Sequence, residues 1–286
     1  LLKKNCKTNC LSKINKTIIL PVSNFKYSKI KLGLDLSSFE NVSFDTFYGS
    51  KKLNFSKFEI EDKDYISIKK QEVSNLRNFK RIGNDIIIDE GNTYVEYPIY
   101  LPKNYNLKVL PGAKIIFKKN AYISIEGGNI QAIGNQDKKI HFEAFSKIDG
   151  WKGILIKNSE KKSIFENVIF KDLNFYSSFK THLTGSINLY KANADFLDTE
   201  FINSKAEDFL NITHSNFNII NSKFINCESD AFDSDFSSGV IKNSEFKQIN
   251  GDAVDFSGSK VYILNSKFEL ISDKAISAGE LSDITS

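Results

Sequence analysis

The chain has 286 residues, and 41% of them are hydrophobic, which is enough to bury a substantial core. It has no run of about 18 apolar residues, so we expect no membrane span. The net charge of +4 hides two opposite ends: residues 1–80 carry 16 Lys or Arg against 8 Asp or Glu, whereas residues 195–286 carry 7 against 16. Neither a basic helix nor regular aromatic spacing accompanies the basic end, so we expect no nucleic-acid partner.

Residues 1–80 contain no repeat. They include alternating runs such as KLNFSKFEIEDKDYISI (52–68), which favour a short β-rich N-terminal segment or cap. The chain begins at Leu1 without a methionine and stops inside the repeat described below. We therefore expect other domains of a longer protein and a truncated C-terminal end.

Residues 85–187 contain short β-rich runs separated by turn residues. The run LPGAKIIF (110–117) is typical of a first coil, and ISIEGGNIQAIG (123–134) and SIFENVIF (163–170) continue the pattern. The stretch KDLNFYSSFKTHLTGSI (171–187) interrupts it. We interpret this stretch as a longer loop inserted in one coil.

From residue 217 to residue 279 the sequence repeats every 22 residues without an insertion. The segments IINSKF, IKNSEF and ILNSKF keep this spacing. Three kinds of residue recur in register: isoleucine, asparagine and phenylalanine, at Ile219, Ile241 and Ile263, at Asn221, Asn243 and Asn265, and at Phe224, Phe246 and Phe268.

This repeat is too short and too alternating for a helical repeat, and it lacks the leucine pattern of leucine-rich repeats. We therefore predict an all-β fold over residues 86–286: a right-handed parallel β-helix, a solenoid with about 22 residues per coil, which follows the short β-rich N-terminal segment. Equivalent positions would then stack roughly 4.8 Å apart. The asparagines would form a ladder at a turn and the phenylalanines a column in the core.

The same register stacks carboxylates. One column contains Asp208, Asp230, Asp252 and then Lys274, and a second contains Asn211, Asp233, Asp255 and Ser277. Stacked carboxylates repel one another unless something compensates. A calcium ion could bridge them, Lys274 could pair with the column, or some carboxyls could stay protonated.

With its repeat established, the sequence resembles the pectin-lyase-like superfamily of right-handed parallel β-helices. Polygalacturonase-type glycoside hydrolases carry Asn-Thr-Asp, Gly-Asp-Asp and Gly-His-Gly on consecutive coils, where this chain has SDAFD, GDAVDFSGS and DKAISAGE. Asp230 and Asp252 match two of those aspartates, but Ala253 replaces the third and the histidine is absent. The resemblance implies the fold and a bacterial extracellular or cell-surface location, and it leaves catalysis in doubt.

We therefore expect an exported or cell-surface protein whose acidic face binds a polysaccharide or surface glycan without catalysis. The candidate glycan-binding residues are Asp233, Asp235, Asp255 and Glu280.

The alternative is a polysaccharide lyase or hydrolase on the face from Asp208 to Glu280. Calcium would be held by the metal candidates Asp230, Asp233, Asp252 and Asp255. Lys274, with a lowered pKa, would abstract a proton beside Asp230 and Asp252. A further interpretation gives the aspartates only a turn-building role in a structural spacer.

Overall fold

The computed structural model describes residues 41–46, 49–54, 74, 76, 78–176 and 183–286, and these contain strands but no helix of more than an isolated turn. The chain divides into two compact units, Leu1–Ile66 and Ser67–Ser286. In the first unit, β1 (Asn41–Thr46) and β2 (Gly49–Asn54) form an antiparallel hairpin. Most of the alternating run at 52–68 lies outside the described residues.

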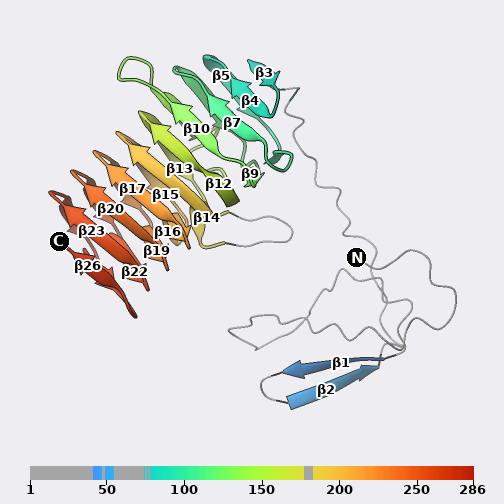
Figure 1. The fold of residues 1–286 in the computed structure, drawn as a ribbon, viewed down its shortest axis with the longest axis vertical. Helices are drawn as coiled ribbons and strands as arrows, with labels where there is room; N and C mark the ends of the chain where they lie inside the picture. The colour runs from blue at the N-terminus through green and yellow to red at the C-terminus, as the bar shows by residue number, and fades with distance from the viewer. Residues whose placement is uncertain (1–40, 47–48, 55–73, 75, 77, 177–182) are drawn as a thin grey trace. The chain divides into compact units, whose positions relative to one another are not determined.

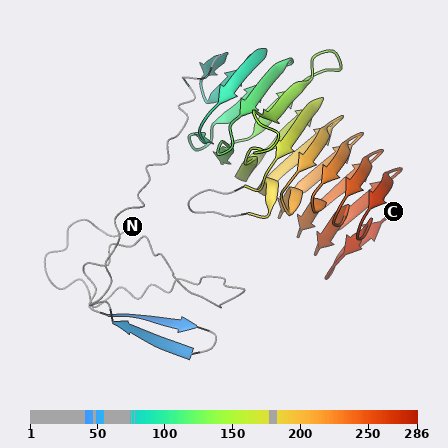
Figure 2. The same cartoon turned by 180° about the vertical axis from the view of Figure 1, so that it is seen from behind.

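The second unit is a parallel β-solenoid of about 8 turns with about 23 residues per coil, which confirms the predicted fold class. Figures 1 and 2 show its strands as stacked rungs that run from β3 to β26. At the first rung, β3 (Phe79–Ile82) pairs antiparallel with β4 (Asp85–Ile88). The pairs after it are parallel, and they form three faces.

Face 1 is the stack of β6 (Ile99–Tyr100), β9 (Ile123–Glu126), the first parts of β12 (Ile154–Glu166) and β14 (Gly185–Leu197), β16 (Asp208–Thr213), β19 (Asp230–Asp235), β22 (Val254–Ser257) and β25 (Ser277–Ala278). Face 2 is the stack of β4, β7 (Asn106–Val109), β10 (Ile130–Ile133), the second parts of β12 and β14, β17 (Asn216–Ile220), β20 (Ser238–Lys242), β23 (Lys260–Leu264) and β26 (Asp283–Thr285). Face 3 is the stack of β5 (Gly91–Val95), β8 (Ala113–Phe117), β11 (Ile140–Ala144), β13 (Val168–Leu173), β15 (Glu200–Ser204), β18 (Lys223–Cys227), β21 (Glu245–Ile249) and β24 (Lys267–Ile271).

Each strand turns alternate side chains into a core that lies between the three faces. The rings of Phe224, Phe246 and Phe268 form the predicted column, with centroids 4.9 and 5.1 Å apart. The column extends toward the N-terminus through Phe201 and Phe170, which stack at 5.4 Å. The single tryptophan of the chain, Trp151, is also buried.

The corner between faces 2 and 3 contains the predicted asparagine ladder. Its residues adopt left-handed backbone conformations, and they are Asn167, Asp198, Asn221, Asn243 and Asn265. The Asn243 amide donates to Oδ1 of Asn221 at 3.3 Å. Asn and Asp tolerate this conformation better than other non-glycine residues, so the sequence suits the corner.

From Asp198 onward, a hydroxyl residue follows each corner residue, and these hydroxyls form a second ladder. Ser222 Oγ accepts a hydrogen bond from the backbone amide of Thr199 at 3.2 Å and donates to the carbonyl of Ile220 at 2.9 Å. Ser244 Oγ accepts from the amide of Ser222 in the same way at 3.2 Å. Each coil is thus bonded to the next at the corner as well as within the sheets.

Candidate functional site

The predicted acidic columns lie on face 1, on its C-terminal coils. Asp230 pairs with Asp208 across β16 and β19, and Asp233 pairs with both Asn211 and Asp255. All of these residues stand at strand positions set by the 22-residue register, so the sequence placed the columns correctly. Phe232, between the aspartates of β19, is fully buried, as its place in the alternation requires.

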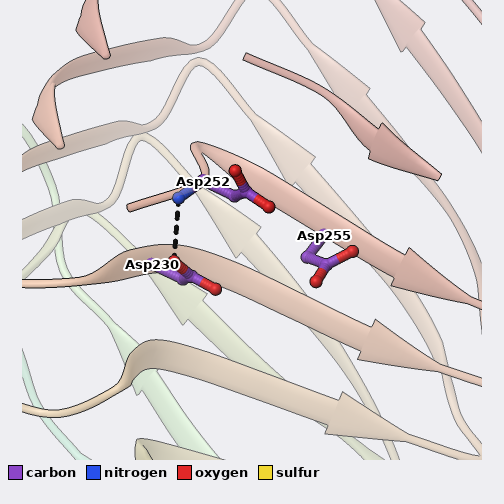
Figure 3. Close-up of side chains that lie close together, drawn as sticks. All are labelled: Asp230, Asp252 and Asp255. Carbon is purple, nitrogen blue, oxygen red and sulfur yellow. Dashed lines mark hydrogen bonds between the residues drawn. The ribbon is translucent and has the colours of Figure 1, made fainter. Parts of the chain in front are cut away.

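Three carboxylates converge at this face. Asp230, Asp252 and Asp255 each offer an oxygen, and these oxygens all lie within 4.8 Å of one another. The backbone amide of Asp252 donates to Oδ1 of Asp230 at 2.8 Å, which holds two of them in place (Figure 3). The site is therefore built by the turn that precedes each strand as well as by the strands themselves.

Lys274 closes the first column. Its ammonium lies 3.1 Å from both carboxylate oxygens of Asp252 and 2.8 Å from Oδ2 of Asp273. Its backbone amide also donates to Asp252 at 2.8 Å. These partners, Asp273 and Asp252, raise the pKa of Lys274 above its usual range. The prediction that Lys274 has a lowered pKa is therefore wrong. Its two carboxylate partners stabilise the charged amine, so the amine stays protonated.

Asp208 and Asp233 are compensated differently. Asn211 bridges them, since its amide nitrogen lies 3.2 Å from Oδ2 of Asp208 and 2.7 Å from Oδ2 of Asp233. Burial raises the pKa of Asp208 to about 6. Burial, followed by the charges of Asp208, Asp235 and Asp255, raises the pKa of Asp233 to about 8. Asp233 is therefore mostly protonated at neutral pH.

The edges of the group show the same effect more weakly. Burial, followed by the neighbouring Asp255 charge, raises the pKa of Asp235. Burial also raises the pKa of Asp230, against the hydrogen bond from the amide of Asp252. Two of the three ways to relieve the stacked charge are thus present among the described residues: an ion pair at Asp252, and raised pKa values at Asp208 and Asp233 on the preceding coils.

The residues fit a calcium ion only in part. Asp230, Asp252 and Asp255 are oxygen ligands of the kind that calcium prefers, but Asp233 is not among the converging carboxylates. Calcium takes about six to eight oxygen ligands, and the Lys274 ammonium already contacts both oxygens of Asp252. An ion would have to displace this ammonium.

Two other candidates lie elsewhere. Glu280 is exposed beyond the last strand of face 1, where its backbone carbonyl accepts from Gly258 at 2.7 Å. Its carboxylate is not part of the converging group. Trp151, the single tryptophan of the chain and a residue type suited to stacking on a sugar, is fully buried against Phe117 with ring centroids 4.0 Å apart.

The predicted loop at 171–187 is shorter in the structure, because β13 runs to Leu173 and β14 begins at Gly185, and its described residues Tyr176 and Leu183 pack on face 1. Tyr176 is almost fully buried and packs against Tyr122 and Leu155, which point out of face 1. Backbone hydrogen bonds from Tyr176 to Gly185 and from Leu183 to Tyr176 fix both ends of the loop. The coils of face 1 from β16 to β25 lie beyond this cluster of side chains.

Sequence reasoning missed one group of residues at the corner between faces 1 and 2. The rings of Tyr190, His214 and Phe236 contact one another at successive coils and are exposed. His214 and Phe236 directly follow the outward residues Thr213 and Asp235 of face 1. The 22-residue spacing of His214 and Phe236 was readable, but the residue type differs between them, and Tyr190 lies 24 residues before His214, so no repeated residue marked the group.

In the described residues, no helix is long and apolar enough to cross a membrane. No family model and no curated protein matches the chain. Solved structures match weakly. A trypsin-treated variant of QnrB1, a plasmid-mediated fluoroquinolone resistance protein, is 13% identical over 67% of this chain and 91% of its own, with a TM-score of 0.19.

Two further solved structures are equally distant. ORF18 of Geobacillus virus E2 is 9% identical over 74% of this chain and 57% of its own, with a TM-score of 0.19. The surface protein and adhesin PfbA of Streptococcus pneumoniae is 12% identical over 68% of this chain and 91% of its own, with a TM-score of 0.13. Similarity this low carries no argument about function.

Proposed function

We propose that the protein binds a polysaccharide or surface glycan along face 1 and does not catalyse a reaction on it. The observation that supports this is the pair of outward columns on the coils from β16 to β25. Asn211, Asp233 and Asp255 form one column, and Thr213 and Asp235 begin the other. These half-buried groups offer hydrogen-bond acceptors and donors at each coil, which suits a ligand that repeats its hydroxyl groups along one direction.

The absence of catalysis is supported by Lys274. Its amine is paired with two carboxylates, and its pKa is raised, so it cannot serve as a base near neutral pH. A purely turn-building role explains Asp230 and Asp252, which bond backbone amides of the next coil. It does not explain Asp233 and Asp255, whose side chains project from the middle of strands.

The test is binding to a panel of soluble polysaccharides, measured by affinity gel electrophoresis. The double variant Asp233→Ala/Asp255→Ala removes these donors and acceptors and should lose retardation by the polysaccharide that the wild type binds. Glu245→Gln, which removes a carboxylate from face 3, is the matched control and should behave like the wild type. Absence of wild-type binding to every member of the panel would refute the proposal.

One observation favours a second candidate, a glycoside hydrolase. Such enzymes pair a protonated carboxyl with an ionised one. Asp233, with its pKa raised to about 8, stands directly beside Asp255 on the next strand. Reducing-sugar release from the same panel tests this candidate. Activity that disappears in Asp233→Asn would replace the binding proposal with the hydrolase, and its absence in the wild type would remove the hydrolase.

We also propose that the solenoid belongs to the pectin-lyase-like superfamily and that the protein is exported or displayed on a bacterial surface. The three-faced parallel coil and the asparagine ladder support the first point. Protease treatment of intact cells that express the full-length protein tests the second. Digestion of an epitope beside the solenoid is expected, and protection until lysis would contradict export.

A further inference from the structure

The corner between faces 1 and 2 has an unusual choice of residues. Its left-handed positions hold Asn158, Lys191, His214, Phe236, Gly258 and Leu281, with φ between 48° and 62°. The corner between faces 2 and 3 has the same conformation but holds only Asn or Asp from residue 167 to residue 265. Bulky side chains disfavour this conformation, whereas Asn and Gly accept it.

The two corners are otherwise built alike. In the C-terminal coils of both corners, a buried serine follows the left-handed residue, and its hydroxyl accepts the backbone amide of the previous coil. At the face 1–2 corner these contacts are Ser215 Oγ with the amide of Ala192 at 2.9 Å and Ser237 Oγ with the amide of Ser215 at 3.0 Å. The backbone therefore does not require His214 or Phe236, and their rings need another explanation.

The rings form a continuous exposed ladder, which we define as Tyr190, His214 and Phe236. The centroid of His214 lies 5.8 Å from Tyr190 and 5.2 Å from Phe236. Phe236 is 61% exposed and Tyr190 is 41% exposed. Neighbouring apolar side chains that are exposed together, as at the edge of this polar face, often mark an interaction site.

Gly258 provides the space for the Phe236 ring. A Cβ atom at this position would lie 2.7 Å from Cδ1 and 2.9 Å from Cε1 of Phe236. On the coil before Phe236, the ring of His214 stacks on the Phe236 ring with an interplanar angle of 17°. The ring of Phe236 is thus held between two coils while much of its surface remains in contact with solvent.

An open depression accompanies the ladder. Its lining combines the two rings with hydroxyl and amide groups, and consists of His214, Ser215, Asn216, Phe236, Ser237 and Ser238. Rings that contact the C–H face of a sugar, beside groups that bond its hydroxyls, match the chemistry of a saccharide. At the Phe236 end the adjacent carboxyl of Asp235 disfavours an anionic ligand, whereas at the other end the Lys191 ammonium lies 5.3 Å from the centroid of the Tyr190 ring.

A peptide fits this surface less well. Peptides that add to a sheet need a free strand edge, but β16, β19 and β22 are paired on both sides. A peptide helix needs an apolar groove, whereas this depression is open and its floor is polar. The described surface therefore favours a polysaccharide chain that runs across successive coils.

We propose that the aromatic ladder is the stacking platform for an uncharged or amino-sugar polysaccharide, with one ring contact per coil. This inference rests on the proposed function, because it adds a platform and a ligand class to glycan binding at the neighbouring face 1. It makes the specific claim that the exposed apolar surface of the rings, and not only the carboxyls, carries the affinity.

The decisive variant is Phe236→Asn, because asparagine suits the left-handed backbone better than phenylalanine does. We expect Phe236→Asn to raise Tm and yet weaken binding by about tenfold. Leu270→Asn is the matched control, since Leu270 is also left-handed and exposed but lies on face 3. It should raise Tm without changing affinity, and Phe236→Tyr should retain binding.

The probes are a soluble neutral glucan, a soluble glucosamine polymer and polygalacturonate, with dissociation constants measured by calorimetry. Wild-type binding to the first or second probe, weakened by Phe236→Asn, is the expected result. Unchanged affinity in Phe236→Asn and in His214→Asn would overturn the ladder proposal. If Asp233→Ala/Asp255→Ala still lost affinity in that case, the proposal of glycan binding on face 1 would stand. Preference for polygalacturonate would overturn the ligand class, and no binding to any probe would overturn both proposals.

Discussion

At the scale of the residue, Asp233 should make stability fall as the pH rises. Its pKa is raised to about 8 by burial and neighbouring carboxyls, from 3.8. Between these values the folded state binds a proton that the unfolded state lacks, so the free energy of unfolding decreases as the pH increases. Asp233→Asn cannot ionise, and because so large a rise in pKa amounts to several kcal/mol, we expect its Tm to exceed that of the wild type by roughly 10 °C at pH 9.

Thermal unfolding by circular dichroism across this pH window checks the prediction. The advantage of Asp233→Asn should shrink steadily toward acid pH and disappear near pH 4, about where the unfolded carboxyl titrates. Asp198→Asn, which removes a carboxyl from the opposite corner, serves as the control and should leave the pH slope unchanged. A constant difference between Asp233→Asn and the wild type at every pH would contradict the account.

Lys274 makes a second prediction at this scale. Its ammonium neutralises the nearly buried carboxylate of Asp252, so Lys274→Gln should lower Tm by several degrees while Lys274→Arg should not. Removal of the ammonium also leaves the three converging carboxylates free for an ion.

Calcium should therefore restore Tm in Lys274→Gln but have little effect on the wild type. Thermal unfolding with calcium chloride and with a chelator measures this difference. An equal gain in both proteins would mean that Lys274 does not compete with the ion.

At the scale of the element, the hydroxyl ladder stabilises the corners by bonding the backbone of one coil to the next. Ser244 is almost fully buried, and its hydroxyl accepts the amide of Ser222. Ser244→Ala leaves that amide without its partner, and we expect a loss of about 1–3 kcal/mol in the free energy of unfolding. Urea unfolding measures the loss, with exposed Ser238→Ala as the control. A loss as large in Ser238→Ala would show that the ladder contacts are not the cause.

The elements also show what the sequence could and could not predict. The 22-residue period set the register, so the Asn221 ladder, the Phe224 column and the stacking of Asp233 on Asp255 were all readable. The period does not predict how the repulsion between the stacked aspartates is relieved. That depends on distances between side chains of different coils, such as the distance from the Lys274 ammonium to the Asp252 carboxylate.

The sequence also did not predict the aromatic ladder of Tyr190, His214 and Phe236 at the edge of face 1. A left-handed corner is normally signalled by Gly or Asn, and His214 and Phe236 give no such signal. Likewise, the sequence marked residues 171–187 as an inserted loop, but the burial of Tyr176 against Tyr122 depends on contacts between distant coils.

At the scale of the whole molecule, the cost of a core substitution should depend on its rung. Phe224 is packed between Phe201 at 4.2 Å and Phe246 at 4.9 Å, whereas Phe268 contacts a neighbouring ring of the column at Phe246 and is only partly buried. Phe224→Ala should cost about 3–5 kcal/mol and Phe268→Ala clearly less. Urea unfolding of both variants measures this difference.

Hydrogen exchange should show the same gradient. In a solenoid each coil contacts only its neighbours, so the terminal coil opens most easily. We expect faster exchange in β24 than in β18, and equal protection along the stack would mean that the solenoid opens only as a whole.

The corner serines also bear on how such a protein can change over generations. Ser222 and Ser244 make the same contacts one coil apart, so an in-frame duplication or loss of 22 residues would rejoin surfaces that already match. The left-handed corner residue lies outside these contacts and can vary without disturbing them. The length of the molecule and the chemistry of its edge are thus open to independent selection.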